Sequence, residues 1–274
     1  MSAPELRQLH TMDEFDSVCR LFSDIWGTDP AAPPVSAEVM RALTHAGNYV
    51  AGAYEDSRLA GASVAFFGEP TGTTLHSHIT GASGGRGIGL ALKLHQRQWA
   101  LARGLKRITW TYDPLIRRNA YFNLTKLGAR PEEYLRSFYG AMDDAINGGD
   151  ESDRVLTAWD LTAPARTAAP DGPHHIPEVP ADAVHGVRDH HGRPEIGPTD
   201  ADFVLIDLPD DIEALRRTDA PAAHAWRLAV RHTLGSLLAD GAHVAGFHDR
   251  RSYIVRRTPS RAAACTQRPN GSHP

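Results

Sequence analysis

The sequence contains little cysteine, no long apolar segment and no excess of basic charge. Cys19 and Cys265 are the two cysteines among 274 residues; they allow no disulfide framework or paired-cysteine metal site, so we expect a reducing compartment, the cytoplasm. No stretch approaches the ~20 apolar residues that cross a bilayer, and Met1 to His10 lacks a basic segment followed by an apolar run. We therefore expect neither secretion nor membrane insertion.

The charge balance also bears on the partners. The chain has 29 basic and 33 acidic side chains, a formal net charge of −4, and the two signs are mixed along it. Because phosphate backbones are bound by basic faces, nucleic acid is not expected as the main partner. With 41% hydrophobic residues, the chain can bury a substantial core, as one large domain or two small ones.

Helix and strand signals fill the first 160 residues. Thr11 and Glu14 form a capping-box pattern that predicts a helix start, followed by apolar residues every three or four positions and a stop at Gly27. A short helix is expected over 36–45, a hairpin over 48–54 and 59–67, and a strand over 75–82. A helix to Arg103, a strand over 107–112, a short helix over 119–127 and strands over 134–139 and 155–161 complete this part.

The second half begins with a segment that has no apolar period. Residues 163–199 are rich in Pro, Gly and His, which favours a linker or loop between a domain at 1–162 and a C-terminal α/β subdomain at 200–257 that packs on it. Residues 258–274 are expected to be a disordered tail. The linker histidines have no regular spacing and no cysteine or clustered carboxylate beside them, so we expect no metal: His174, His175, His185, His190 and His191.

A glycine-rich turn joins the strand over 75–82 to the helix that follows. Such a turn lets backbone come close to a ligand, and the unpaired amides at the helix start attract phosphate. The turn is therefore a candidate diphosphate site, although glycines at this junction are also common tight-turn residues. It comprises Gly84, Gly85, Arg86, Gly87, Ile88 and Gly89.

The order of strand, Gly-Arg-Gly-Ile-Gly turn, long helix, strand and the segment Asn119 to Ala129 resembles the GNAT N-acetyltransferases over roughly Glu5 to Leu161. The resemblance implies a mixed, mostly antiparallel, twisted α/β sheet flanked by helices and splayed between its fourth and fifth strands. It implies that the glycine turn holds the diphosphate of acetyl-CoA or another acyl-CoA. Asn119 and Phe122 would then flank the pantetheine, and the amides of Ile79 to Gly81 would polarise the thioester carbonyl.

A narrower resemblance is to a bacterial GNAT subgroup with a C-terminal extension, here a helix and hairpin from Phe203 onward. It rests on the segments His76-Ser77-His78, Lys93 with Gln96-Arg97, Trp110 to Leu115 and Ser152-Asp153-Arg154. The chain departs from the family in a shortened glycine loop with Gly84 where Gln or Arg is usual. It also has Leu124 where the family often has the tyrosine that protonates the thiolate.

Three residues are candidates for the chemistry. An amine must lose a proton as it attacks a thioester, and His78 could accept it; a buried structural histidine is the alternative. Asp113 could bind an acceptor ammonium or orient a histidine, or it could start an Asp-Pro turn. Tyr121, Tyr112 or Tyr139 would have to replace the missing tyrosine; we favour Tyr121. Asn119 could also cap its helix.

The expected activity is transfer of an acetyl or short acyl group from CoA to the amine of a small molecule by direct attack. One alternative is a GNAT-like enzyme that processes the acyl group, such as a decarboxylase, with His78 and Thr80 in that role. Another is a non-catalytic CoA-binding or scaffold protein. The sequence also leaves a homodimer possible as the oligomeric state.

Overall fold

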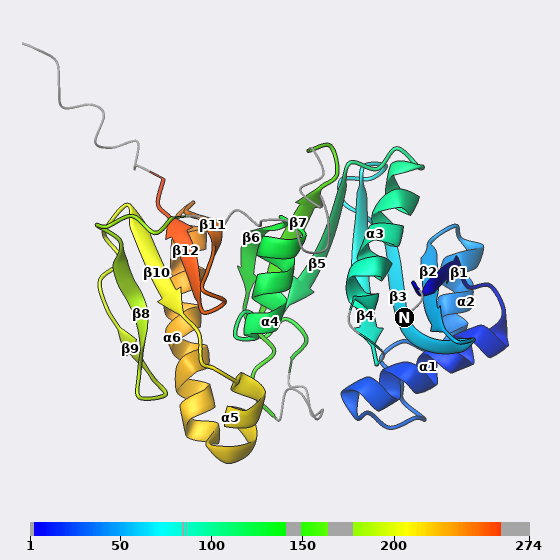
Figure 1. Cartoon of the computed structure of the whole chain (residues 1–274), viewed down its shortest axis with the longest axis horizontal. Coiled ribbons are helices and arrows are strands. Elements are labelled where there is room, and N and C mark those ends of the chain that lie inside the picture. The colour runs from blue at the N-terminus through cyan, green and yellow to red at the C-terminus, as the bar shows by residue number, and fades with distance from the viewer. Residues whose placement is uncertain (1–2, 84, 86, 141–148, 164–177, 259–274) are drawn as a thin grey trace, which may run out of the picture.

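The chain forms two β-sheets with helices packed against them, as seen in the computed structural model (Figure 1). The structure describes residues 3–83, 85, 87–140, 149–163 and 178–258. A seven-stranded sheet uses the N-terminal part and a five-stranded sheet the C-terminal part. The expected mixed α/β class with mostly antiparallel strands is therefore confirmed.

The first sheet has the strand order β1-β2-β3-β4-β5-β7-β6. All neighbours in it are antiparallel except β4 and β5, which run parallel. The strand predicted over 134–139 instead runs from Arg130 to Leu135 and is the last in this order. The strands are β1 (Glu5–Gln8), β2 (Tyr49–Glu55), β3 (Arg58–Gly68), β4 (Thr74–Ala82), β5 (Arg107–Tyr112), β6 (Arg130–Leu135) and β7 (Arg154–Asp160).

Helices cover both faces of this sheet. Val50 packs with α1 (Met12–Trp26) and α2 (Ala37–His45), whereas its neighbour Ala51 packs in a cluster with Trp99 of α3 (Ile88–Leu101). Because successive strand residues point to opposite faces, α1 and α2 lie on one face and α3 on the other.

Local signals explain where α1 begins and ends. The Thr11 hydroxyl accepts a hydrogen bond from the Glu14 amide at 3.4 Å, and the Glu14 carboxylate accepts one from the Thr11 amide at 3.0 Å. This is the predicted capping box. Gly27, with φ of 64°, ends the helix in the left-handed region.

The short helix after β5 differs from the prediction. It begins at Arg117 as α4 (Arg117–Ala120) and continues as the π-helix η1 (Tyr121–Lys126). Ile116 occupies the cap position, so Asn119 does not cap this helix.

The second sheet has the order β11-β12-β10-β8-β9. The linker predicted over 163–199 is wrong in its second part, because residues 184–196 form a hairpin of two strands of this sheet. Residues 164–177 of the predicted linker lie outside the described part. Gly186 and Val187 of this hairpin are both buried: a Cβ at Gly186 would lie 3.0 Å from Thr233 of the C-terminal helix, and Val187 belongs to the core cluster that contains Trp226. The strands are β8 (Val184–His190), β9 (Arg193–Ile196), β10 (Phe203–Asp207), β11 (His243–His248) and β12 (Ser252–Arg256). The tail predicted over 258–274 falls outside the described residues apart from Thr258.

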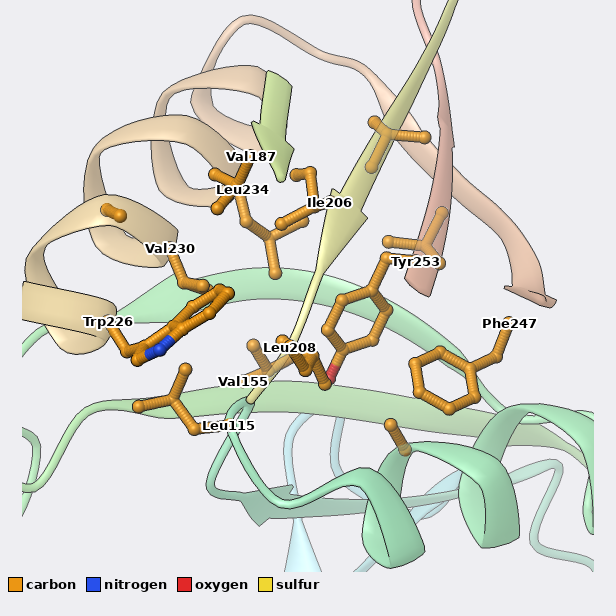
Figure 2. Packing of buried hydrophobic residues seen from close by; sticks show 14 of the residues in the cluster. Leu115, Val155, Val187, Ile206, Leu208, Trp226, Val230, Leu234, Phe247 and Tyr253 are labelled. Carbon is orange, nitrogen blue, oxygen red and sulfur yellow. The ribbon is translucent and has the colours of Figure 1, made fainter. Parts of the chain in front are cut away.

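The two halves share one hydrophobic core. Two helices, α5 (Ile212–Thr218) and α6 (Ala220–Ala239), follow β10. Figure 2 shows Trp226 and Val230 of α6 beside Leu115 and Val155 of the first half, with Tyr253 of β12 nearby. All five side chains are buried. The C-terminal part thus packs directly on the first sheet. None of the helices among the described residues is long and apolar enough to cross a membrane.

Candidate functional site

The first sheet is split between β4 and β5. The two strands pair only from Thr74 to His76 and from Arg107 to Thr109. Beyond that point they separate toward their C-terminal ends (Figure 1). The strand edges that face each other there lack a strand partner, so their backbone groups are available to a ligand. We call the point where Ser77 and Trp110 follow the last paired residues the fork.

A β-bulge lies in β4 next to the fork. Val64 pairs with Ile79 but Ala65 pairs with Ser77, so His78 is the extra residue. Bulges interrupt the ladder and redirect side chains, and they are frequent beside active sites. His78 therefore has a backbone environment unlike the rest of the strand.

His76 and His78 lie together against the Phe66 ring, with centroid distances of 5.3 and 5.8 Å. The His76 Nδ1 is 3.1 Å from the Thr109 hydroxyl across the last strand pair. Burial lowers the pKa of both imidazoles, that of His76 to about 4 with His78 and Lys93 contributing. Both rings are therefore neutral at pH 7 and can accept a proton.

The opposite face of the fork carries polar residues of α3. The Lys93 ammonium donates to the Ser77 hydroxyl at 2.9 Å and lies 4.0 Å from the centre of the Trp110 ring. Burial lowers the pKa of Lys93 to about 7. Gln96, which is fully buried, donates to the Ser63 hydroxyl at 3.2 Å, and its Oε1 has no hydrogen-bond partner among the described residues.

The glycine turn lies at the wide end of the split. Gly87 occupies the cap position of α3 with φ of 100°, a conformation that glycine adopts without strain. A Cβ added at Gly87 or Gly89 would meet nothing within 4 Å, so the helix start faces open space. The Gly85 amide points to the Glu55 carboxylate at 3.4 Å. An anionic ligand at these amides would have to displace Glu55.

Several predicted binding residues are explained by packing. Ile88 is 2% exposed and packs with Leu92 in the core. Ile79 packs on the α1 side of the sheet. A Cβ at Gly81 would lie 2.7 Å from the Trp26 ring, so packing against α1 requires glycine there. Gly84 and Arg86 lie outside the described residues.

The helix after β5 borders the fork. Phe122 packs on the cluster that contains Trp110. The Trp110 indole donates to Asn123, a buried residue, at 3.2 Å. Asn119 is half-buried, and Asn123 is the asparagine that contacts the fork. The helical spacing did not single out Asn123, because any residue on the inner face of this helix could have contacted Trp110.

The three candidate tyrosines lie in different places. The Tyr121 hydroxyl accepts from Arg250 at 3.4 Å and lines a cavity of about 360 Å³ between the two halves. The Tyr112 hydroxyl is buried 3.2 Å from that of Tyr253. The Tyr139 hydroxyl is 3.3 Å from the hydroxyl of Thr111, two residues after Thr109 on the same face of β5. Tyr139 is thus the tyrosine that the structure brings to the histidine side of the split.

Asp113 is occupied by two arginines of the C-terminal half. Its carboxylate accepts from Arg227 at 2.9 Å through both oxygens and from Arg216 at 2.6 Å. Burial alone would raise the pKa of Asp113, but these two guanidinium groups hold it well below its usual range. A carboxylate paired in this way has no room to bind an acceptor ammonium, so we leave Asp113 out of the proposed chemistry.

Among the described residues, no three His, Cys, Asp or Glu side chains come together as a metal site would require. No protein-family model matches the chain, and no curated protein matches it.

The chain is similar to several solved acetyltransferase structures. One is the Escherichia coli ribosomal-protein-S18-alanine N-acetyltransferase, 14% identical, covering 61% of this chain and 99% of that one with a TM-score of 0.46. A probable acetyltransferase from Staphylococcus epidermidis is 14% identical over 58% of this chain and 99% of its own, with a TM-score of 0.48. Arabidopsis thaliana Naa50, solved with a bisubstrate analogue of CoA, is 14% identical over 57% and 98%, with a TM-score of 0.46.

Proposed function

We propose that this chain is an acyl-CoA-dependent acyltransferase that moves an acetyl or short acyl group to the amine of a small molecule. The observation that carries the proposal is the split between β4 and β5, with an open glycine helix start at its wide end and the bulged His78 near its narrow end. A long ligand with phosphates at one end and a reactive group at the other fits this arrangement.

The glycine helix start would hold the CoA diphosphate. Gly87 and Gly89 leave space where any side chain would intrude, and the first amides of α3 have no helical partner. The pantetheine would extend along the unpaired edge of β4 toward the fork. The amides around the bulge would then polarise the thioester carbonyl, since donors fixed in advance stabilise developing negative charge best.

His78 would accept the proton of the attacking amine. Its imidazole is neutral at pH 7 and lies on the face of the sheet that carries His76 and Thr109. The Tyr139 hydroxyl, beside Thr111 on β5, is the group we now favour for returning a proton to the leaving thiolate. Direct attack requires no covalent intermediate on the protein.

The test is release of free CoA thiol from acetyl-CoA and from longer acyl-CoAs in the presence of a panel of small amines, with the acylated product identified by mass spectrometry. Amine-dependent release that is lost in His78→Ala supports the proposal. CoA release without any amine would favour the acyl-processing alternative. Binding of CoA without turnover on any amine would favour a non-catalytic CoA-binding protein.

A further inference from the structure

Lys93 is a buried cation at the fork without a carboxylate. Its side chain is buried, with 5% of the residue exposed. The contacts of its ammonium are the Ser77 hydroxyl at 2.9 Å and the Trp110 ring at 4.0 Å. No carboxylate among the described residues forms an ion pair with it. Charged groups this deeply buried are almost always paired, because the loss of hydration costs several kcal/mol.

The ammonium also has unused hydrogen-bonding capacity. An ammonium carries three donors, and one of them is used here, by Ser77. Buried donors normally have partners, and two free donors together suit the two oxygens of a carboxylate. The Trp110 face attracts positive charge and so stabilises the protonated form of the amine. The surroundings therefore offer the ammonium a hydroxyl and an aromatic face but no anion.

The other titratable groups near Lys93 do not provide that anion. His76 and His78 of β4 are neutral at pH 7 because burial lowers the pKa of both imidazoles, and Arg97 on the next turn of α3 is a second cation. Burial lowers the pKa of Lys93 to about 7, so this ammonium loses its proton more readily than that of an exposed lysine. A bound anion would favour the charged form, as an opposite charge does within a few ångströms.

The position of Lys93 tells which part of a ligand it would meet. Ser77 lies five residues before Ala82, the last residue of β4, which is about 17 Å along the strand. A ligand whose phosphates lie at the glycine helix start therefore reaches Lys93 with its opposite end. In an acyl-CoA that end is the acyl group.

We propose that Lys93 selects acyl-CoA donors whose acyl chain ends in a carboxylate, such as malonyl-CoA or succinyl-CoA, by pairing with that carboxylate at the fork. This inference rests on the proposed function, because it assumes that acyl-CoA lies in the split between β4 and β5. It adds the class of acyl group, which the glycine turn and the histidines leave open.

The experiment compares length-matched acyl-CoAs by calorimetry on the full-length protein at pH 7. Succinyl-CoA is paired with butyryl-CoA, and malonyl-CoA with propionyl-CoA, so that each pair differs in the terminal carboxylate. We expect the dicarboxylic member of at least one pair to bind about tenfold more tightly, as a charge-assisted hydrogen bond implies. Lys93→Met should abolish this preference and leave the affinity for free CoA near wild type.

Arg97→Met is the matched control, because it removes a cation one turn along the same helix that contacts the Leu161 carbonyl instead of the fork. It should keep the preference. Equal affinities within both pairs in the wild type, with CoA still bound, would overturn the inference and leave the proposed function standing. A preference that survives Lys93→Met would also overturn it. Absence of binding for CoA and every acyl-CoA would instead remove the proposed function, and this inference with it.

Discussion

Asp113→Asn should destabilise the protein strongly, because Asp113 forms ion pairs with two buried arginines. The side chains of Arg216 and Arg227 are 2% and 0% exposed. After the substitution, the charge of Asp113 is lost, whereas the Asp150 carboxylate stays 3.1 and 3.0 Å from Arg216 and Arg227. Breaking a buried pair from one side costs about 3–5 kcal/mol, because the remaining charge stays buried without compensation. We expect a loss of that size in the free energy of unfolding.

Urea unfolding at pH 7 measures this loss, with Asp210→Asn as the matched control. Asp210 also pairs with an arginine, at 2.5 Å, but its side chain is 87% exposed. Exposed pairs contribute about 0–1 kcal/mol, so the control should change little. A loss below about 1 kcal/mol for Asp113→Asn would refute the structural role. A folded variant with a raised KM for the amine and unchanged stability would restore Asp113 to the acceptor site.

The ion pairs of Asp113 also predict how the free energy of unfolding depends on pH. Because the folded-state pKa of Asp113 is held below its unfolded value of 3.8, its contribution is fully present above that value and is lost as the pH falls through the folded pKa. The stability difference between wild type and Asp113→Asn should therefore be the same at pH 5 as at pH 7. A difference that shrinks by pH 5 would mean that the carboxyl is not held ionised by Arg216 and Arg227.

Three further predictions concern the proposed site. His78→Ala should lower turnover by about 10²–10⁴-fold with acyl-CoA affinity near wild type. The acid limb of the wild-type turnover-pH profile should lie below pH 6.5, because burial lowers the pKa of His78. Full turnover in the variant would exclude His78 as the base. Gly89→Val should weaken CoA binding at least tenfold by calorimetry with little change in Tm, because the position faces open space without a strained φ; unchanged affinity would mean that the loop is only a turn. Tyr139→Phe should lower kcat more than Tyr121→Phe does, and the reverse order would return Tyr121 to the chemistry.

Local sequence signals predicted those parts of the fold that local interactions determine. The Thr11 to Glu14 capping box, the hairpin of β2 and β3, and the order β4, glycine turn, α3 all depend on residues close together in the chain. The split between β4 and β5 was expected from the resemblance to GNAT proteins, and the strand pairing confirms it.

Long-range pairing could not be predicted in the same way. Asp113 meets Arg216 and Arg227 across more than 100 residues, and nothing around Asp113 distinguishes a buried ion pair from an exposed turn. The β8 and β9 hairpin was missed because its residues are rich in His, Gly and charge, and it becomes a sheet edge only beside β10. Nothing in the sequence indicated that Lys93 is buried, because its contacts with Ser77 of β4 and Trp110 of β5 form only when the sheet packs on α3.

The most direct test of the account is calorimetric titration of free CoA into the wild-type protein. We predict a saturable heat and a higher Tm in the presence of CoA, because a ligand that binds only the folded state stabilises it by mass action. Both effects should be weakened in Gly89→Val, which blocks the open helix start. Neither heat nor a thermal shift at millimolar CoA would contradict the claim that the split between β4 and β5 is an acyl-CoA site.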